Sequence, residues 1–297
     1  MHHVTIEPRG PYRLNATIGF LNQFQPAGLR TTNEESALRL AFVVDGMDEV
    51  AGVDIRQSED DGDVDVGVTT EAPVDAVTRQ VARLLSLDHD GTDYPDLGRR
   101  NPVMSALQAA NPGFRPTGFW SPFEAAVWAI TSHRIQMSQA AKAKAGIAQR
   151  FGTVVHHDGH ELTAFPSPAV LAEADLATVP GLGGRKPEWL RGIALAALDG
   201  ALDTGRLRAM PTNEALGELQ RLAGVGPFSA ELILIRGAMT VDVAPGNERR
   251  HAASLAAAYD LEEPVDADTI ARITDGWAPY RTWASVLIRA ARESSMG

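Results

Sequence analysis

A turn containing two glycines and a proline is the part of this sequence best suited to bind an anion. A helical pattern ends at Leu222, and the turn and the start of a second helix follow as Gly224-Val225-Gly226-Pro227-Phe228-Ser229. Such a turn leaves backbone N–H groups pointing outward at a helix N-terminus, where the helix dipole favours a phosphate. The pattern predicts a helix-hairpin-helix over about residues 212–238, although a tight turn without a ligand has the same local sequence.

The segment after this hairpin carries carboxylates within a short loop. An apolar run, Ile233-Leu234-Ile235, leads to Asp242-Val243-Ala244-Pro245, and Glu248 lies three residues after the proline. This string resembles the loop of the helix-hairpin-helix DNA glycosylase superfamily, in which a similar string leads to a catalytic aspartate.

Further motifs resemble the alkyladenine (3-methyladenine) DNA glycosylase II branch of that superfamily. They are Phe165-Pro166-Ser167-Pro168 followed by Leu171, the stretch from Gly181 to Lys186 followed by Leu190, and the stretch from Trp277 to Trp283. The resemblance covers about residues 12–292, and the absence of cysteine argues against the iron–sulfur endonuclease branch.

The resemblance implies a base-excision enzyme that hydrolyses the N-glycosidic bond of a flipped, damaged base. No lysine lies near the loop to form a Schiff base, so a monofunctional glycosylase is expected. Two alternatives remain open: a protein of the same fold that recognises lesions or DNA structure without cleaving, and a helical protein-interaction module in which the hairpin turn is incidental.

The family's catalytic aspartate is absent from this loop. The family spacing of proline, two residues and acid places the catalytic position at Glu248, and a shift of one residue places it at Asn247. A glutamate carries the same charge on a longer arm, and neighbouring arginines would favour its ionised form. Asp242 is a weaker candidate, because it matches a structural position at the start of the family loop.

The resemblance also assigns binding roles to other positions. His133 and Arg134 match the family's gap-filling wedge, where Arg134 could lie in the minor groove or on a phosphate, or be a solvated arginine at a helix end. The predicted base pocket consists of His133, Phe228, Leu232 and Arg289. The predicted DNA-binding residues are Arg134, Gly224, Val225, Gly226, Phe228, Ser229, Arg249 and Arg250. The family's monovalent cation, sodium or potassium, matches the backbone carbonyls of Gln220, Leu222 and Val225; no other cofactor is expected.

These side chains require a helical scaffold, and the sequence predicts one after an N-terminal α+β domain. Residues 1–95 contain alternating runs typical of an antiparallel sheet, with a hairpin tip at 59–65 and a helix over 73–87. Residues 96–297 form the predicted glycosylase region, which begins with a connection that ends at Pro122. One long helix over 122–151 is expected there, and a loop that contains His156, His157 and His160.

Charge and composition permit this interpretation. The net charge is −11, but residues 1–95 hold 7 basic and 17 acidic residues, whereas residues 96–297 hold 20 and 21. The acidity therefore belongs to the N-terminal part, and Arg236, Arg249 and Arg250 could form a local cationic face. No apolar run is long enough to span a bilayer. We expect a cytoplasmic monomer that binds damaged double-stranded DNA and makes no contact with a membrane.

Overall fold

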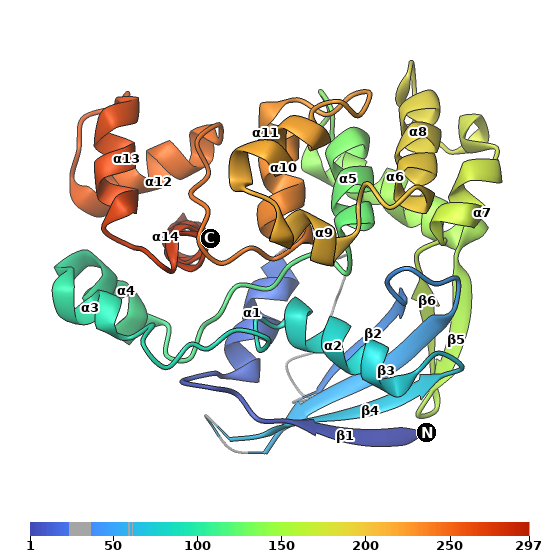
Figure 1. Ribbon diagram of the computed structural model, residues 1–297, viewed down its shortest axis with the longest axis horizontal. Helices are drawn as coiled ribbons and strands as arrows, with labels where there is room; N and C mark the ends of the chain where they lie inside the picture. The colour runs from blue at the N-terminus through green and yellow to red at the C-terminus, as the bar shows by residue number, and fades with distance from the viewer. Residues whose placement is uncertain (24–36, 59, 61, 297) are drawn as a thin grey trace.

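An antiparallel sheet forms the N-terminal part of the chain in the computed structural model, which describes residues 1–23, 37–58, 60 and 62–296. The strand order is β1-β4-β3-β2, with bounds β1 His2–Ile6, β2 Ala37–Val43, β3 Val50–Gln57 and β4 Val64–Thr70. Helices α1 (Leu14–Gln23) and α2 (Val74–Leu84) pack on this sheet (Figure 1) and share its apolar core. The predicted strands and the predicted helix over 73–87 are confirmed; residues 59 and 61 of the acidic tip lie outside the described residues.

A second hairpin, β5 (Thr153–His157) with β6 (His160–Ala164), packs against this sheet. The expected histidine loop is therefore wrong: these residues belong to two strands. His157 is buried, and its ring nitrogens contact Thr69 Oγ1 at 2.9 Å and Asp54 Oδ1 at 3.0 Å. Gly52 allows this approach, because a Cβ there would lie 2.8 Å from Val155 Cγ1.

The central helices pack around a second apolar core. Their bounds are α5 Pro122–Thr131, α6 Met137–Phe151, α7 Pro168–Glu173, the 3-10 helix η2 Leu176–Thr178, α8 Lys186–Leu198, α9 Thr204–Ala209, α10 Thr212–Leu219, α11 Pro227–Leu232 and the π-helix η3 Ile233–Gly237. All ten residues of α5 are buried, so the helix that contributes most to this core is also the one that leads to the predicted wedge.

The long helix predicted over 122–151 is instead two helices. Ser121 caps the first helix as expected, accepting the N–H of Glu124 at 3.1 Å. Gln136 and Gln139 then form a capping box that starts α6. Because such a box satisfies the first N–H groups of a new helix, the chain turns between the two helices, and Arg134 adopts a φ of +53° there.

A third apolar core joins the C-terminal helices to the segment predicted as a connection. That segment contains two helices, α3 (Asp96–Arg100) and α4 (Pro102–Ala110), and α4 contacts α14. The C-terminal helices are α12 Arg249–Tyr259, α13 Ala267–Asp275 and α14 Arg281–Met296. The predicted boundary at residue 95 stays a prediction. Among the described residues, no helix is both long and apolar enough to cross a membrane.

Candidate active site and nucleic-acid interface

The predicted helix-hairpin-helix lies between α10 and α11. Gly224 in its turn has a φ of +85°, and a Cβ there would lie 2.8 Å from Ile130 Cδ1 and from the Trp189 ring. Gly226 precedes the helix as its N-cap, and Pro227 occupies its first turn. A glycine is required at 224 both by the left-handed backbone and by the close approach of the two side chains.

The hairpin combines backbone N–H groups that have no acceptor in the helix with one solvent-exposed aromatic ring. The first N–H groups of α11 have no acceptor within the helix, and Phe228 is 46% exposed, whereas Val225 and Ser229 are buried. On the other side of the turn, the Leu222 carbonyl accepts the N–H of Val225 at 3.0 Å. The hairpin can thus offer N–H donors and a stacking surface to one ligand.

The loop after η3 is fixed to α14 at its start. Asp242 accepts the backbone N–H of Arg281 at 3.1 Å and its guanidinium at 2.7 Å. The Thr282 hydroxyl accepts the N–H of Val243 at 3.1 Å and donates to its carbonyl at 2.8 Å. The carboxylate of Asp242 is therefore engaged in holding the loop.

The end of this loop is fixed to the hairpin by Glu231, a residue of α11. Glu231 is only 7% exposed. Its carboxylate accepts the backbone N–H of Gly246 at 3.1 Å, the backbone N–H of Asn247 at 2.9 Å and the Asn247 side-chain amide at 2.7 Å. Hairpin and loop consequently form one hydrogen-bonded unit.

Glu248 follows directly as the N-cap of α12 and forms an ion pair with Arg289 of α14. The structure thus brings together one predicted catalytic residue and one predicted pocket residue. His251, one turn further along α12, is 1% exposed. Burial and then the charge of Arg289 lower the pKa of His251 to about 4, so its ring is neutral at neutral pH.

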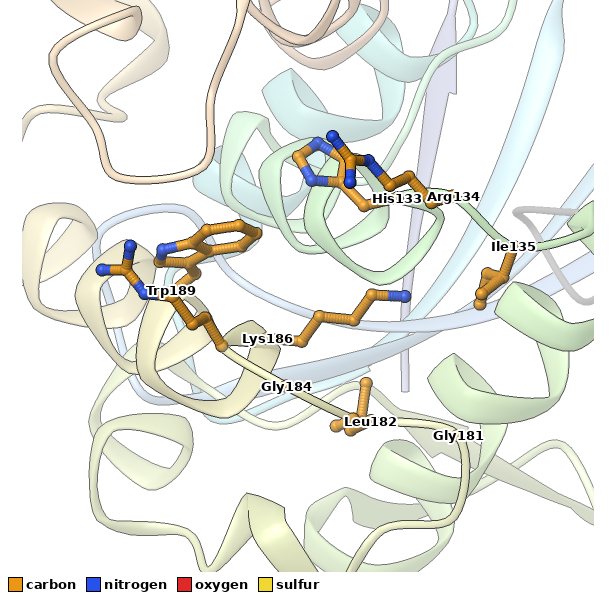
Figure 2. A pocket seen from close by; sticks show the side chains of 10 residues that line it. His133, Arg134, Ile135, Gly181, Leu182, Gly184, Lys186 and Trp189 are labelled. Atoms are coloured by element: carbon orange, nitrogen blue, oxygen red, sulfur yellow. The ribbon is translucent and has the colours of Figure 1, made fainter.

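An open cavity of about 1060 Å³ lies between the turn after α5 and the start of α8. It is lined by residues 133–135, residues 181–186 and Trp189, none of them acidic. Figure 2 shows His133 and Arg134 on one wall and Trp189 with Lys186 on the wall that α8 provides. The rings of His133 and Trp189 meet edge to face at 5.7 Å. The cavity combines cationic groups with an aromatic ring, a set that suits nucleic acid.

The surroundings of two basic groups in this cavity lower their pKa values. Lys186 is buried and donates from Nζ to the Thr131 carbonyl at 2.8 Å, and burial lowers its pKa. Burial, followed by the charges of Lys186 and Arg134, also lowers the pKa of His133. Arg185 lies over the Trp189 ring at 5.3 Å, and its guanidinium donates to the Glu188 carboxylate from Nε at 3.3 Å and from Nη2 at 3.2 Å.

The arginines around the loop do not form the single cationic face that the sequence suggested. Arg236 is buried, donates to the Thr117 carbonyl and lies over the Phe20 ring at 5.2 Å. Arg249 and Arg250 are exposed in the first turn of α12. Of these three arginines, the latter two can therefore face a phosphate.

Sequence reasoning missed Glu231. Its signal was an acidic residue within a run of otherwise apolar or small residues, Ser229-Ala230-Glu231-Leu232-Ile233. A carboxylate on the buried side of a helix requires donors from elsewhere, but the sequence does not say which donors. The folded loop supplies them.

The curated proteins that are similar to this chain include two bacterial DNA-3-methyladenine glycosylases. It is 23% identical over 212 residues to the DNA-3-methyladenine glycosylase of Bacillus subtilis (strain 168), covering 70% of each chain. It is 31% identical over 191 residues to the DNA-3-methyladenine glycosylase 2 of Escherichia coli (strain K12), covering 62% of each. The chain thus spans less than two thirds of the Escherichia coli protein. No protein-family profile matches the chain.

A solved structure shares the fold over the whole length. The 3-methyladenine DNA glycosylase from Archaeoglobus fulgidus is 20% identical and superimposes with a TM-score of 0.81, covering 100% of both chains. This similarity establishes the predicted mainly α architecture with its N-terminal α+β part.

Proposed function

We propose that this chain, which belongs to the helix-hairpin-helix DNA glycosylases of the alkyladenine branch, hydrolyses the N-glycosidic bond of a flipped, damaged base in duplex DNA. The observation that carries the proposal is the link from Glu231 in the hairpin to Gly246 and Asn247 in the acidic loop. Because of this link, a phosphate bound at the hairpin would have a fixed position relative to the carboxylates.

DNA binding is proposed to use the hairpin first. The backbone N–H groups of Gly224, Gly226 and Ser229 would hold a phosphate, and the exposed ring of Phe228 would lie against the DNA. Arg249 and Arg250 add positive charge at the N-terminus of α12, where the helix dipole also favours an anion. A sodium or potassium ion on the carbonyls of Gln220, Leu222 and Val225 would add to this charge. The proposed partner is damaged duplex DNA, bound by one copy of the chain in the cytoplasm.

The cavity at His133 and Arg134 is proposed to receive the DNA strand beside the flipped base. Arg134 projects from a turn rather than from a helix, with a φ of +53°. An arginine in this position can fill the gap or hold a phosphate of the distorted strand. The base itself would enter the pocket proposed around Phe228, Leu232 and Arg289.

The proposed reaction is a hydrolysis with a single displacement. The bond between C1′ and the base nitrogen breaks, its electron pair leaves with the base, and positive charge develops on the deoxyribose. Water forms the new bond to C1′, and its proton is released and taken up by the departing base. Glu248 is the proposed carboxylate for this charge, and its ion pair with Arg289 fixes its position at the start of α12. The paired charge of Glu248 also makes the pocket better suited to an uncharged lesion than to a cationic methylated purine.

The test is base release from duplexes that carry a panel of cationic and uncharged damaged bases, followed by alkaline cleavage of abasic sites. We expect release by the wild type, loss of release in Glu248→Gln, and a smaller effect of Asp242→Asn. Borohydride should trap no covalent adduct, because the reaction needs no lysine. Salt-sensitive DNA binding without release from any duplex would instead indicate a protein that recognises lesions without cleaving.

A further inference from the structure

A buried negative charge lies directly behind the acidic loop. The carboxylate of Glu231 accepts three hydrogen bonds from the described residues, and all three donors are neutral: two backbone N–H groups and the amide of Asn247. Glu248 differs in this respect, because Arg289 neutralises it. A carboxylate in a site of low dielectric acts more strongly on nearby charge than one paired with an arginine.

The orientation of Asn247 follows from this contact. Its Nδ2 atom donates to Glu231 Oε1 at 2.7 Å. Since an ionised carboxylate only accepts hydrogen bonds, the amide nitrogen and not Oδ1 is the atom of the Asn247 side chain that is bonded to Glu231. Asn247 is exposed, so a ligand can reach this residue. A hydrogen bond to a carboxylate also increases the electron density on the amide oxygen.

We propose that Glu231 is a positioning residue for base excision. It fixes the orientation of Asn247 and increases the negative partial charge on the amide oxygen, which faces the deoxyribose. The pair would act beside Glu248, which stands at the position of the family's absent aspartate. The inference rests on the proposed glycosylase activity and deepens it. In this arrangement Asn247 contacts the sugar, and Glu231 acts through it.

A purely structural brace would have the same three hydrogen bonds, so the test must separate charge from folding. Glu231→Gln keeps the size of the side chain and removes its charge. The double variant combines Glu231→Gln with Asn247→Asp. It has a carboxylate at position 247 instead of 231, and the amide introduced at position 231 can donate a hydrogen bond to it. Glu214→Gln is the matched control, because Glu214 is an exposed glutamate on the neighbouring helix α10.

The measurement is the single-turnover rate of base release with enzyme in excess, together with the dissociation constant for the same duplex and the melting temperature of each variant. We expect Glu231→Gln to release base about 100-fold more slowly with DNA affinity within about threefold of the wild type. We expect the double variant to recover to within about tenfold, and Glu214→Gln to match the wild type.

The outcomes distinguish a failure of the proposed role of Glu231 from a failure of the proposed glycosylase activity. If Glu231→Gln releases base at the wild-type rate, or if the folded, DNA-binding double variant stays as slow as Glu231→Gln, the proposed role of Glu231 is wrong while the glycosylase activity stands. If the wild type releases no base from any duplex of the panel, both the activity and this inference fail.

Discussion

Three carboxylates around one loop have three different environments. Asp242 is held by Arg281, Glu248 is paired with Arg289, and Glu231 has only neutral donors among the described residues. Pairing with a guanidinium favours the ionised form of a carboxylate. Because the guanidinium charge offsets that of the carboxylate, the pair acts less strongly on a developing positive charge than an unpaired carboxylate does. The three residues are therefore not interchangeable. Substitutions should change the order of the loop at Asp242, the proposed catalytic carboxylate at Glu248 and the charge behind Asn247 at Glu231.

The buried ring of His251 makes stability depend on pH. Neither ring nitrogen has a hydrogen-bond partner among the described residues, and burial, then Arg289, lowers the pKa of His251 to about 4. The unfolded chain therefore binds a proton that the folded chain does not, and stability falls as pH drops from about 6.5 to about 4. The cost at the acidic end is on the order of 3 kcal/mol.

We expect His251→Leu to remove most of this acid sensitivity. Urea unfolding of the wild type and of His251→Leu at about pH 7 and about pH 5 measures it, with the exposed His3→Gln as control. Equal loss of stability in His251→Leu and the wild type would contradict the account.

At the scale of elements, the hairpin turn depends on one glycine. Gly224→Ala would force a left-handed backbone on alanine and press a methyl group onto Ile130 and Trp189. We expect a loss of about 2 kcal/mol of stability together with weaker DNA binding. Gly226→Ala is the matched control: its φ is −93°, and a Cβ there meets nothing within 4 Å. Urea unfolding compares the two, and equal stability of both variants would count against the turn geometry.

The elements show what the sequence could and could not predict. Periodicity and capping predicted the strands, the helix on the sheet and the hairpin, because these depend on neighbours in sequence. The break between α5 and α6 was missed, since an alanine-rich amphipathic pattern continues across it. The pairing of His157 with Asp54 and of Glu231 with Asn247 joins distant segments, so no local pattern could reveal it. The roles of the site residues came from the family resemblance rather than from local patterns.

At the scale of the whole molecule, the chain is acidic and yet proposed to bind DNA. Its acidity is concentrated in residues 1–95, whereas the hairpin between α10 and α11 and the first turn of α12 belong to the C-terminal part (Figure 1). The residues that line the cavity also belong to that part. In the proposed complex, backbone N–H groups supply part of the phosphate binding, so we expect few counterions to be released when it forms.

Arg134 provides a direct test of this distribution. We expect Arg134→Gln to lower the slope of log affinity against log salt by about 1, and Arg79→Gln, on the exposed side of α2, to leave it unchanged. Fluorescence anisotropy with a lesion-bearing duplex over a series of salt concentrations measures both slopes. An unchanged slope for Arg134→Gln would remove Arg134 from the proposed DNA contacts.

The central claim, hydrolysis of the bond between C1′ and the base, is tested most directly by mass spectrometry of the DNA after a single turnover in heavy-oxygen water. We predict a free, unmodified lesion base and an unbroken strand whose abasic sugar carries the heavy oxygen. A strand that keeps its base in every duplex of the panel, or one that is cleaved at the abasic site, would contradict the account.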